Sequence, residues 1–93
     1  MNTANLQLEG MVMAVASLCE ALVDKGLLNH KEVGAAFERA MQAVEQDDAH
    51  QLSEANLAAA TFPVRLLSLA NQAHERGKKF TFSDYAAIVG KLT

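Results

Sequence analysis

The chain of 93 residues has little of what marks a secreted, membrane-spanning or disulfide-bonded protein. Its single cysteine, Cys19, excludes an intramolecular disulfide, so a reducing cytoplasm is the expected compartment. The longest uncharged runs, 10–19 and 55–64, are about ten residues long, whereas a helix that crosses a bilayer needs roughly 20. No basic segment precedes the first apolar run. We therefore expect neither membrane association nor a signal peptide.

Motifs for metal binding and catalysis are also missing. The histidines and Cys19 do not pair at the short spacings of zinc ligands, and the five glycines form no phosphate-binding loop. Cys19 falls on an apolar helical stripe, where cysteine usually acts as an inert small hydrophobe. His74 falls in a last helical turn, where an imidazolium interacts favourably with the helix dipole. Asp47 and Asp48 are predicted to solvate a helix junction. We expect a non-enzymatic protein with no catalytic residue, cofactor or metal.

Alanine and helical periodicity are abundant in the sequence. Seventeen of the 93 residues are alanine, five are aromatic and none is tryptophan. Alanine has the best helix propensity but buries little area, so the composition predicts closely packed helices around a thin core. The length predicts one domain over residues 1–93. A thin core is often stabilised by oligomerisation, so a homodimer is one hypothesis.

The N-terminal part of the chain predicts a helical hairpin. Apolar residues at helical spacing predict a first helix over 5–25: Leu8, Met11, Val12, Val15, Leu18, Cys19, Leu22 and Val23. Lys25-Gly26 is a helix stop, and Asn29 with Glu32 predicts the capping box of a second helix over 30–46. The short connection favours antiparallel neighbours.

The twelve residues from Leu22 to Val33 resemble the hairpin of short bacterial helical modules, among them SHOCT-type oligomerisation domains. They share the order of a helix, a glycine, two apolar residues, a cap and a glutamate. Capping rules produce this order without common ancestry, so we assign no family on it.

The second half of the chain predicts helices over 50–61, 63–76 and 82–92. Pro63 lacks an N–H group and its ring clashes one turn back, which favours a break there over a kink in one long helix. Arg76-Gly77 is a second helix stop, and Thr81 with Asp84 predicts the last N-cap. The predicted fold is an all-α, compact bundle of four to five helices built on the N-terminal antiparallel hairpin.

The charge distribution offers one possible binding surface. Residues 1–64 carry a net charge of −6 and residues 65–93 a net charge of +3. A basic turn, flanked by aromatic side chains that could stack on bases, contains Arg76, Lys78, Lys79, Phe80 and Phe82. The chain as a whole is acidic, and Asp84 stands where phosphate would bind. A solvated basic loop is therefore preferred, and a nucleic-acid-associated regulatory protein is the alternative function.

A second possible surface lies on the first helix. Met13, Ala16 and Ala21 lie off its main stripe, so the helix is apolar over more than half of its circumference. Such a width is typical of a helix buried between two neighbours or of one with an intermolecular face. The sequence thus predicts a non-enzymatic helical protein–protein interaction module in the cytoplasm, with self-association as a homodimer as one form of the interaction.

Overall fold

The computed structural model describes residues 3–46, 53–79 and 81–92, and those residues contain helices and connections but no strand. The helices are α1 (Thr3–Asp24), α2 (His30–Glu45), α3 (Glu54–Glu75) and α4 (Phe82–Leu92). The predicted all-α class is confirmed. Asp47, Asp48 and Phe80, on which two of the predictions fall, lie outside the described residues.

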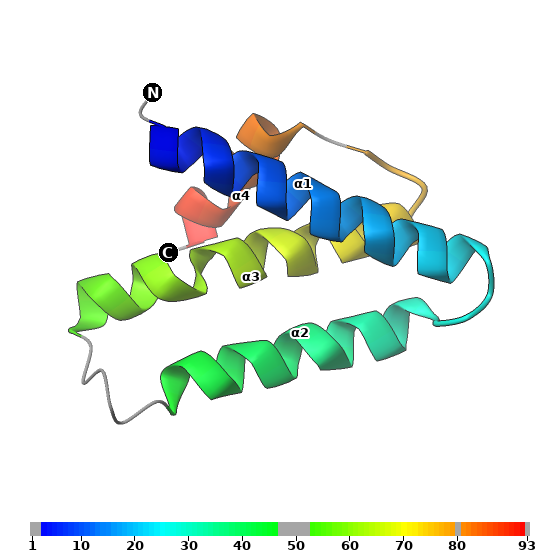
Figure 1. Cartoon of the computed structure of the whole chain (residues 1–93), viewed down its shortest axis with the longest axis horizontal. Helices are drawn as coiled ribbons and strands as arrows, with labels where there is room; N and C mark the ends of the chain where they lie inside the picture. The colour runs from blue at the N-terminus through cyan, green and yellow to red at the C-terminus, as the bar shows by residue number, and fades with distance from the viewer. Residues whose placement is uncertain (1–2, 47–52, 80, 93) are drawn as a thin grey trace.

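The third helix is the centre of the molecule. Helix α3 packs against each of the other three helices. Figure 1 shows α1 and α2 on opposite sides of α3, with α4 behind, near α1 and α3. The short connection does join α1 to α2, but their main contacts are with α3 rather than with each other. A bundle organised around an α1–α2 hairpin is therefore not confirmed.

The α1–α2 turn has the predicted capping interactions. Gly26 has a φ of 77°, and the Leu27 N–H donates to the Leu22 carbonyl at 3.0 Å. Such a left-handed residue after a helix end favours glycine, which has no Cβ to clash. The Asn29 side chain accepts from the Glu32 N–H at 2.8 Å, and Glu32 accepts from the Asn29 N–H at 3.0 Å. Both halves of the predicted capping box are present.

Pro63 does not break the chain into two helices, so that prediction was wrong. Helix α3 runs continuously through it from Glu54 to Glu75. Two residues before it, the buried Thr61 hydroxyl donates to the carbonyls of Leu57 at 3.0 Å and Ala58 at 3.3 Å. Buried residues on both sides of Pro63 (Thr61, Leu66, Ala70 and Ala73) tie the whole helix to the core. Packing along the helix thus outweighs the local cost of the proline.

The main core lies where α1, α3 and α4 meet. Its buried residues are Val12, Ala16, Leu66, Ala70, Ala73, Tyr85 and Val89. Helix α2 adds buried Val33 and Phe37. The predicted cap of α4 is present: the Thr81 N–H donates to Asp84 Oδ2 at 3.2 Å, and the Asp84 N–H donates to Thr81 Oγ1 at 3.1 Å.

Candidate functional site

The exposed large apolar side chains gather on one helix. In the described part of the chain they are Leu6, Met11, Val15, Leu18 and Leu27, all on α1 or in the turn that follows it. Met11 is 68% exposed, Leu18 61% and Val15 37%. These three residues are spaced by four and three positions, so they lie on one side of the helix. Leu22, half-buried, continues the series by one more step of four.

We call Met11, Val15, Leu18 and Leu22 the outer α1 face. It contains no charged residue. The adjacent face of α1 contains the buried Val12 and Ala16, which pack in the core with α3. Helix α1 thus has two apolar faces. One packs in the core, and the other is exposed or half-buried at the surface of the described residues.

The structure changes which residues of α1 form the second surface. The sequence placed Met11, Val15 and Leu18 on the main apolar stripe of the first helix, and in the structure all three are exposed. Ala16, predicted to lie on a partner-binding surface, is 8% exposed and belongs to the core. Met13 is half-buried and Ala21 is exposed. Periodicity gives the width of an apolar sector but not the part of it on which a neighbouring helix packs.

Helix α1 also has the length and composition of a membrane span. Residues Leu6–Asp24 have a mean hydropathy of 1.5, and 11% of that window is buried. Core helices of soluble proteins, which are mostly buried, and signal sequences near an N-terminus have the same length and composition. Composition therefore does not assign α1 to a membrane, and the expectation of no membrane association stays a prediction.

A polar cluster joins α1, α2 and α3 at the end of the molecule near the α1–α2 turn. His30 Nδ1 lies 2.9 Å from Asn71 Oδ1, and Asn71 Nδ2 donates to the His30 carbonyl at 3.0 Å. Because the Asn71 amide nitrogen donates to the His30 carbonyl, the Asn71 amide oxygen faces Nδ1 of the His30 ring. An amide oxygen only accepts, so Nδ1 carries the ring hydrogen and donates it. The His30 and His74 rings pack edge to face, with their centroids 4.9 Å apart. His74 Nε2 lies 3.4 Å from Asp24 Oδ1, on an exposed aspartate that adds little to stability.

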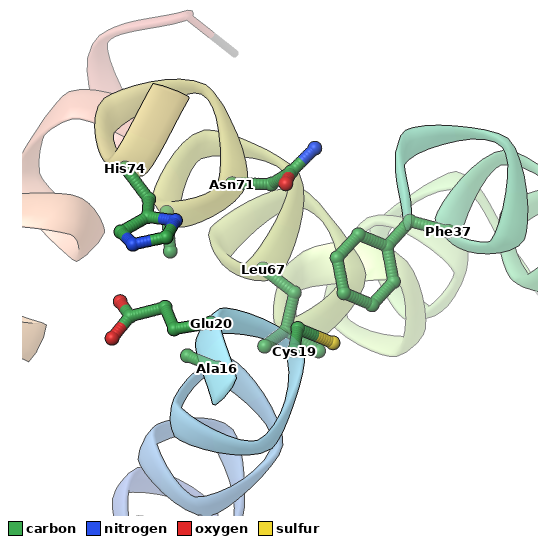
Figure 2. A pocket seen from close by; sticks show the side chains of 8 residues that line it. Ala16, Cys19, Glu20, Phe37, Leu67, Asn71 and His74 are labelled. Atoms are coloured by element: carbon green, nitrogen blue, oxygen red, sulfur yellow. The ribbon is translucent and has the colours of Figure 1, made fainter. Parts of the chain in front are cut away.

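Beside this cluster lies a small cavity lined by Cys19, Glu20, Phe37, Leu67, Asn71 and His74, together with two alanines, Ala16 and Ala70. Figure 2 shows the Cys19 sulfur directed toward Phe37, and the Glu20 carboxylate on the side of His74. The cavity has a volume of about 10 Å³, the size for one water molecule. Burial raises the pKa of the Cys19 thiol, and the Glu20 charge raises it further. A nucleophilic cysteine needs the opposite shift, so this cavity does not resemble a thiol active site.

Metal ligands do not converge on this end of the molecule either. In the ranges 3–46, 53–79 and 81–92, no group of three His, Cys, Asp or Glu side chains could hold a metal ion. The sequence could not have revealed the His30–Asn71 pair, because 41 residues separate its members. Its position between two helices and its double hydrogen bond give it a structural role.

A wider groove lies on the α4 side of the molecule. Its volume is about 270 Å³, and its lining comes from α2, α3 and α4: Glu38, Met41, Arg65, Ser68, Leu69, Gln72 and Val89. Charged, polar and apolar side chains all contribute to this lining. The lining contains no group of chemically similar side chains that would indicate a class of ligand.

The basic turn has only part of the predicted arrangement. Arg76, Lys78 and Lys79 are exposed near one another in the chain between α3 and α4. Phe82 is half-buried and packs against the main core, so it is not a free platform for stacking on a base. The three cations remain available to an anionic partner, and binding of nucleic acid stays a prediction.

No protein-family model, curated protein or solved structure matches this chain. The choice between candidate sites therefore depends on geometry alone. By that criterion the outer α1 face stands out, because most of the exposed large apolar side chains of the described residues lie on α1.

Proposed function

We propose that this chain is a small, non-enzymatic protein–protein interaction module that acts in the cytoplasm and self-associates through the outer α1 face. The observation that carries this proposal is the exposure of Met11, Val15 and Leu18 on one side of one helix. Scattered exposed apolar residues are normal on a protein surface, whereas contiguous ones mark an interaction site.

The energetics favour a second copy as the partner. Burying one such side chain completely contributes about 1.5–3 kcal/mol. Scaled by their exposed fractions, burial of the three side chains contributes about 4 kcal/mol per chain. A symmetric pair buries two such faces, and this contributes about 8 kcal/mol. Association costs about 4–15 kcal/mol in lost freedom of motion. The burial of two faces lies well within the range of that cost, whereas the burial of one face against a polar surface only reaches its lower limit.

A charged residue within the face tests the proposal. Leu18→Glu places a carboxylate in the interface, whereas Ser17→Glu adds the same charge one residue away, at an exposed position outside the face. Analytical ultracentrifugation over a range of micromolar concentrations should show dimers for the wild type and Ser17→Glu. The dissociation constant of Leu18→Glu should be about 30-fold higher or more. A wild-type chain that stays monomeric at the highest concentration, and that captures no protein partner, would contradict the function.

A further inference from the structure

We infer that the partner of the outer α1 face is the same face of a second copy, packed antiparallel, with Met11 of one chain opposite the partner's Leu22. This inference deepens the proposed function and rests on it. It follows from three observations: the spacing of the face, the one charge at its end, and the residues beside it.

The spacing of the face matches the seam of two paired helices. Members at 11, 15, 18 and 22 alternate steps of four and three, which is the 3.5-residue repeat of a coiled-coil seam. The same steps extend the series to Leu8, which is half-buried and also packs against the main core, at one end and to the exposed Lys25 at the other. The Lys25 N–H donates to the Ala21 carbonyl at 3.0 Å, so the helical path continues to Lys25. A two-fold axis between Val15 and Leu18 matches every member of this series with another member.

The charge at the end of the series selects the orientation. A parallel pair would place Lys25 beside the partner's Lys25, and like charges at facing positions repel. An antiparallel pair places Lys25 beside the partner's Leu8, where the lysine stem covers an apolar side chain and its ammonium group reaches water. Opposed helix dipoles add to the same preference. Lys25 is the one charged member of the series, so it decides between the two orientations.

The residues beside the face point to an identical partner. On the side away from the core, the flanking row is Gln7, Ala14 and Ala21, all exposed and uncharged. Helix pairs that choose a different partner do so through complementary charges in such rows, and this row offers none. The two alanines let a second helix approach closely. A symmetric pair also covers both outer faces at once and forms a closed dimer.

Disulfide cross-linking measures the orientation directly. In a Cys19→Ser background, Met11→Cys and Leu22→Cys chains are mixed and oxidised, and the products are identified by mass. Antiparallel pairing predicts mixed 11–22 cross-links, with same-site cross-links about tenfold rarer. The two copies of position 11 would lie about 16 Å apart along the pair, well beyond the roughly 7 Å that a disulfide spans. Ser17→Cys, exposed but outside the face, is the matched control and should not cross-link.

A second measurement needs no cysteine and covers the case in which Leu22→Cys fails to fold. Antiparallel pairing places position 8 beside the partner's Lys25, so Leu8→Glu should dimerise about fivefold more tightly than Leu8→Lys at low salt. The difference should vanish at high salt. Parallel pairing would place like charges together in both variants and predicts no difference. Circular dichroism establishes that the two variants have equal helix content.

The outcomes separate this inference from the proposed function. Predominant 11–11 cross-links, or equal dimerisation of the two Leu8 variants, would overturn the antiparallel pairing and leave the module intact. A dimer that Leu18→Glu does not weaken would overturn the outer α1 face as the interface. A monomeric wild type that co-sediments with phosphatidylcholine vesicles would overturn both proposals and make lipid the occupant of the face.

Discussion

Asn71 on α3 makes two hydrogen bonds to one residue of α2: its oxygen lies 2.9 Å from His30 Nδ1, and its nitrogen donates to the His30 carbonyl at 3.0 Å. His30 is the first residue of α2, directly after the Asn29 cap. The pair therefore fixes the start of α2 against the last turns of α3. It is a long-range counterpart of the local capping box beside it.

Replacement of Asn71 by alanine should destabilise the protein measurably. The variant leaves the His30 imidazole and carbonyl without their partner, which costs about 1–3 kcal/mol when the groups are shielded from water. Urea unfolding followed by circular dichroism measures the free energy of unfolding. Gln72→Ala, at the exposed neighbouring position, should change it by less than about 0.5 kcal/mol. Equal effects of the two variants would mean that the pair contributes nothing.

Two glycines should respond to alanine in opposite directions. A Cβ at Gly34 would meet Asn71 Nδ2 at 3.6 Å, an ordinary contact, so Gly34→Ala should stabilise α2 by up to about 1 kcal/mol. Gly26 has open space around it but a φ of 77°, so Gly26→Ala should destabilise the turn by about 1–2 kcal/mol. Thermal unfolding of the two variants in parallel tests the signs. A stabilising Gly26→Ala would contradict the left-handed helix end.

Pro63 should be replaceable with a gain in stability. Alanine restores a main-chain N–H inside a helix that is already continuous, and proline is about 3 kcal/mol less favourable than alanine in a helix interior. Because Pro63 is half-buried and loses some packing, the expected gain is about 1–2 kcal/mol. Urea unfolding measures it, with Ala60→Gly at an exposed position of the same helix as a control that should lose about 1 kcal/mol. A loss for Pro63→Ala would show that the core is fitted to the proline ring.

Cys19 should react slowly with alkylating agents while the chain is folded. Burial first, and the Glu20 charge second, raise the pKa of its thiol, so less thiolate is present at a given pH than in the unfolded chain. At about pH 8.5 iodoacetamide should label the native chain more slowly than the chain in urea. Glu20→Gln removes the second cause and should speed native labelling, whereas Glu9→Gln, on another turn of α1, should not.

The raised pKa of Cys19 also makes the free energy of unfolding depend on pH. As the pH rises through the unfolded-state pKa of Cys19, the unfolded chain loses its proton first, so the free energy of unfolding decreases from there up to the folded-state pKa. Cys19→Ser should remove this part of the pH dependence. Urea unfolding at a series of alkaline pH values measures the slope, and an unchanged slope in the variant would contradict the raised pKa.

The sequence by itself determined where most helices begin and end. The Asn29–Glu32 box, the Gly26 stop and the Thr81–Asp84 cap are all present in the structure. Each of these features depends on hydrogen bonds or a φ angle within a few residues of chain. Local chemistry is enough to specify them, and no other part of the molecule needs to be known.

Only the tertiary structure decided how the helices pack against one another. Helix α3 packs against all the others, keeps its course through Pro63, and packs beside Ala16 while Met11 and Leu18 stay exposed. The sequence showed that α1 is apolar over more than half of its circumference. Which part of that circumference is buried depends on how closely the small side chains of α1 and α3 fit together, and that contact joins residues some fifty positions apart. The exposed outer face is what that packing leaves over.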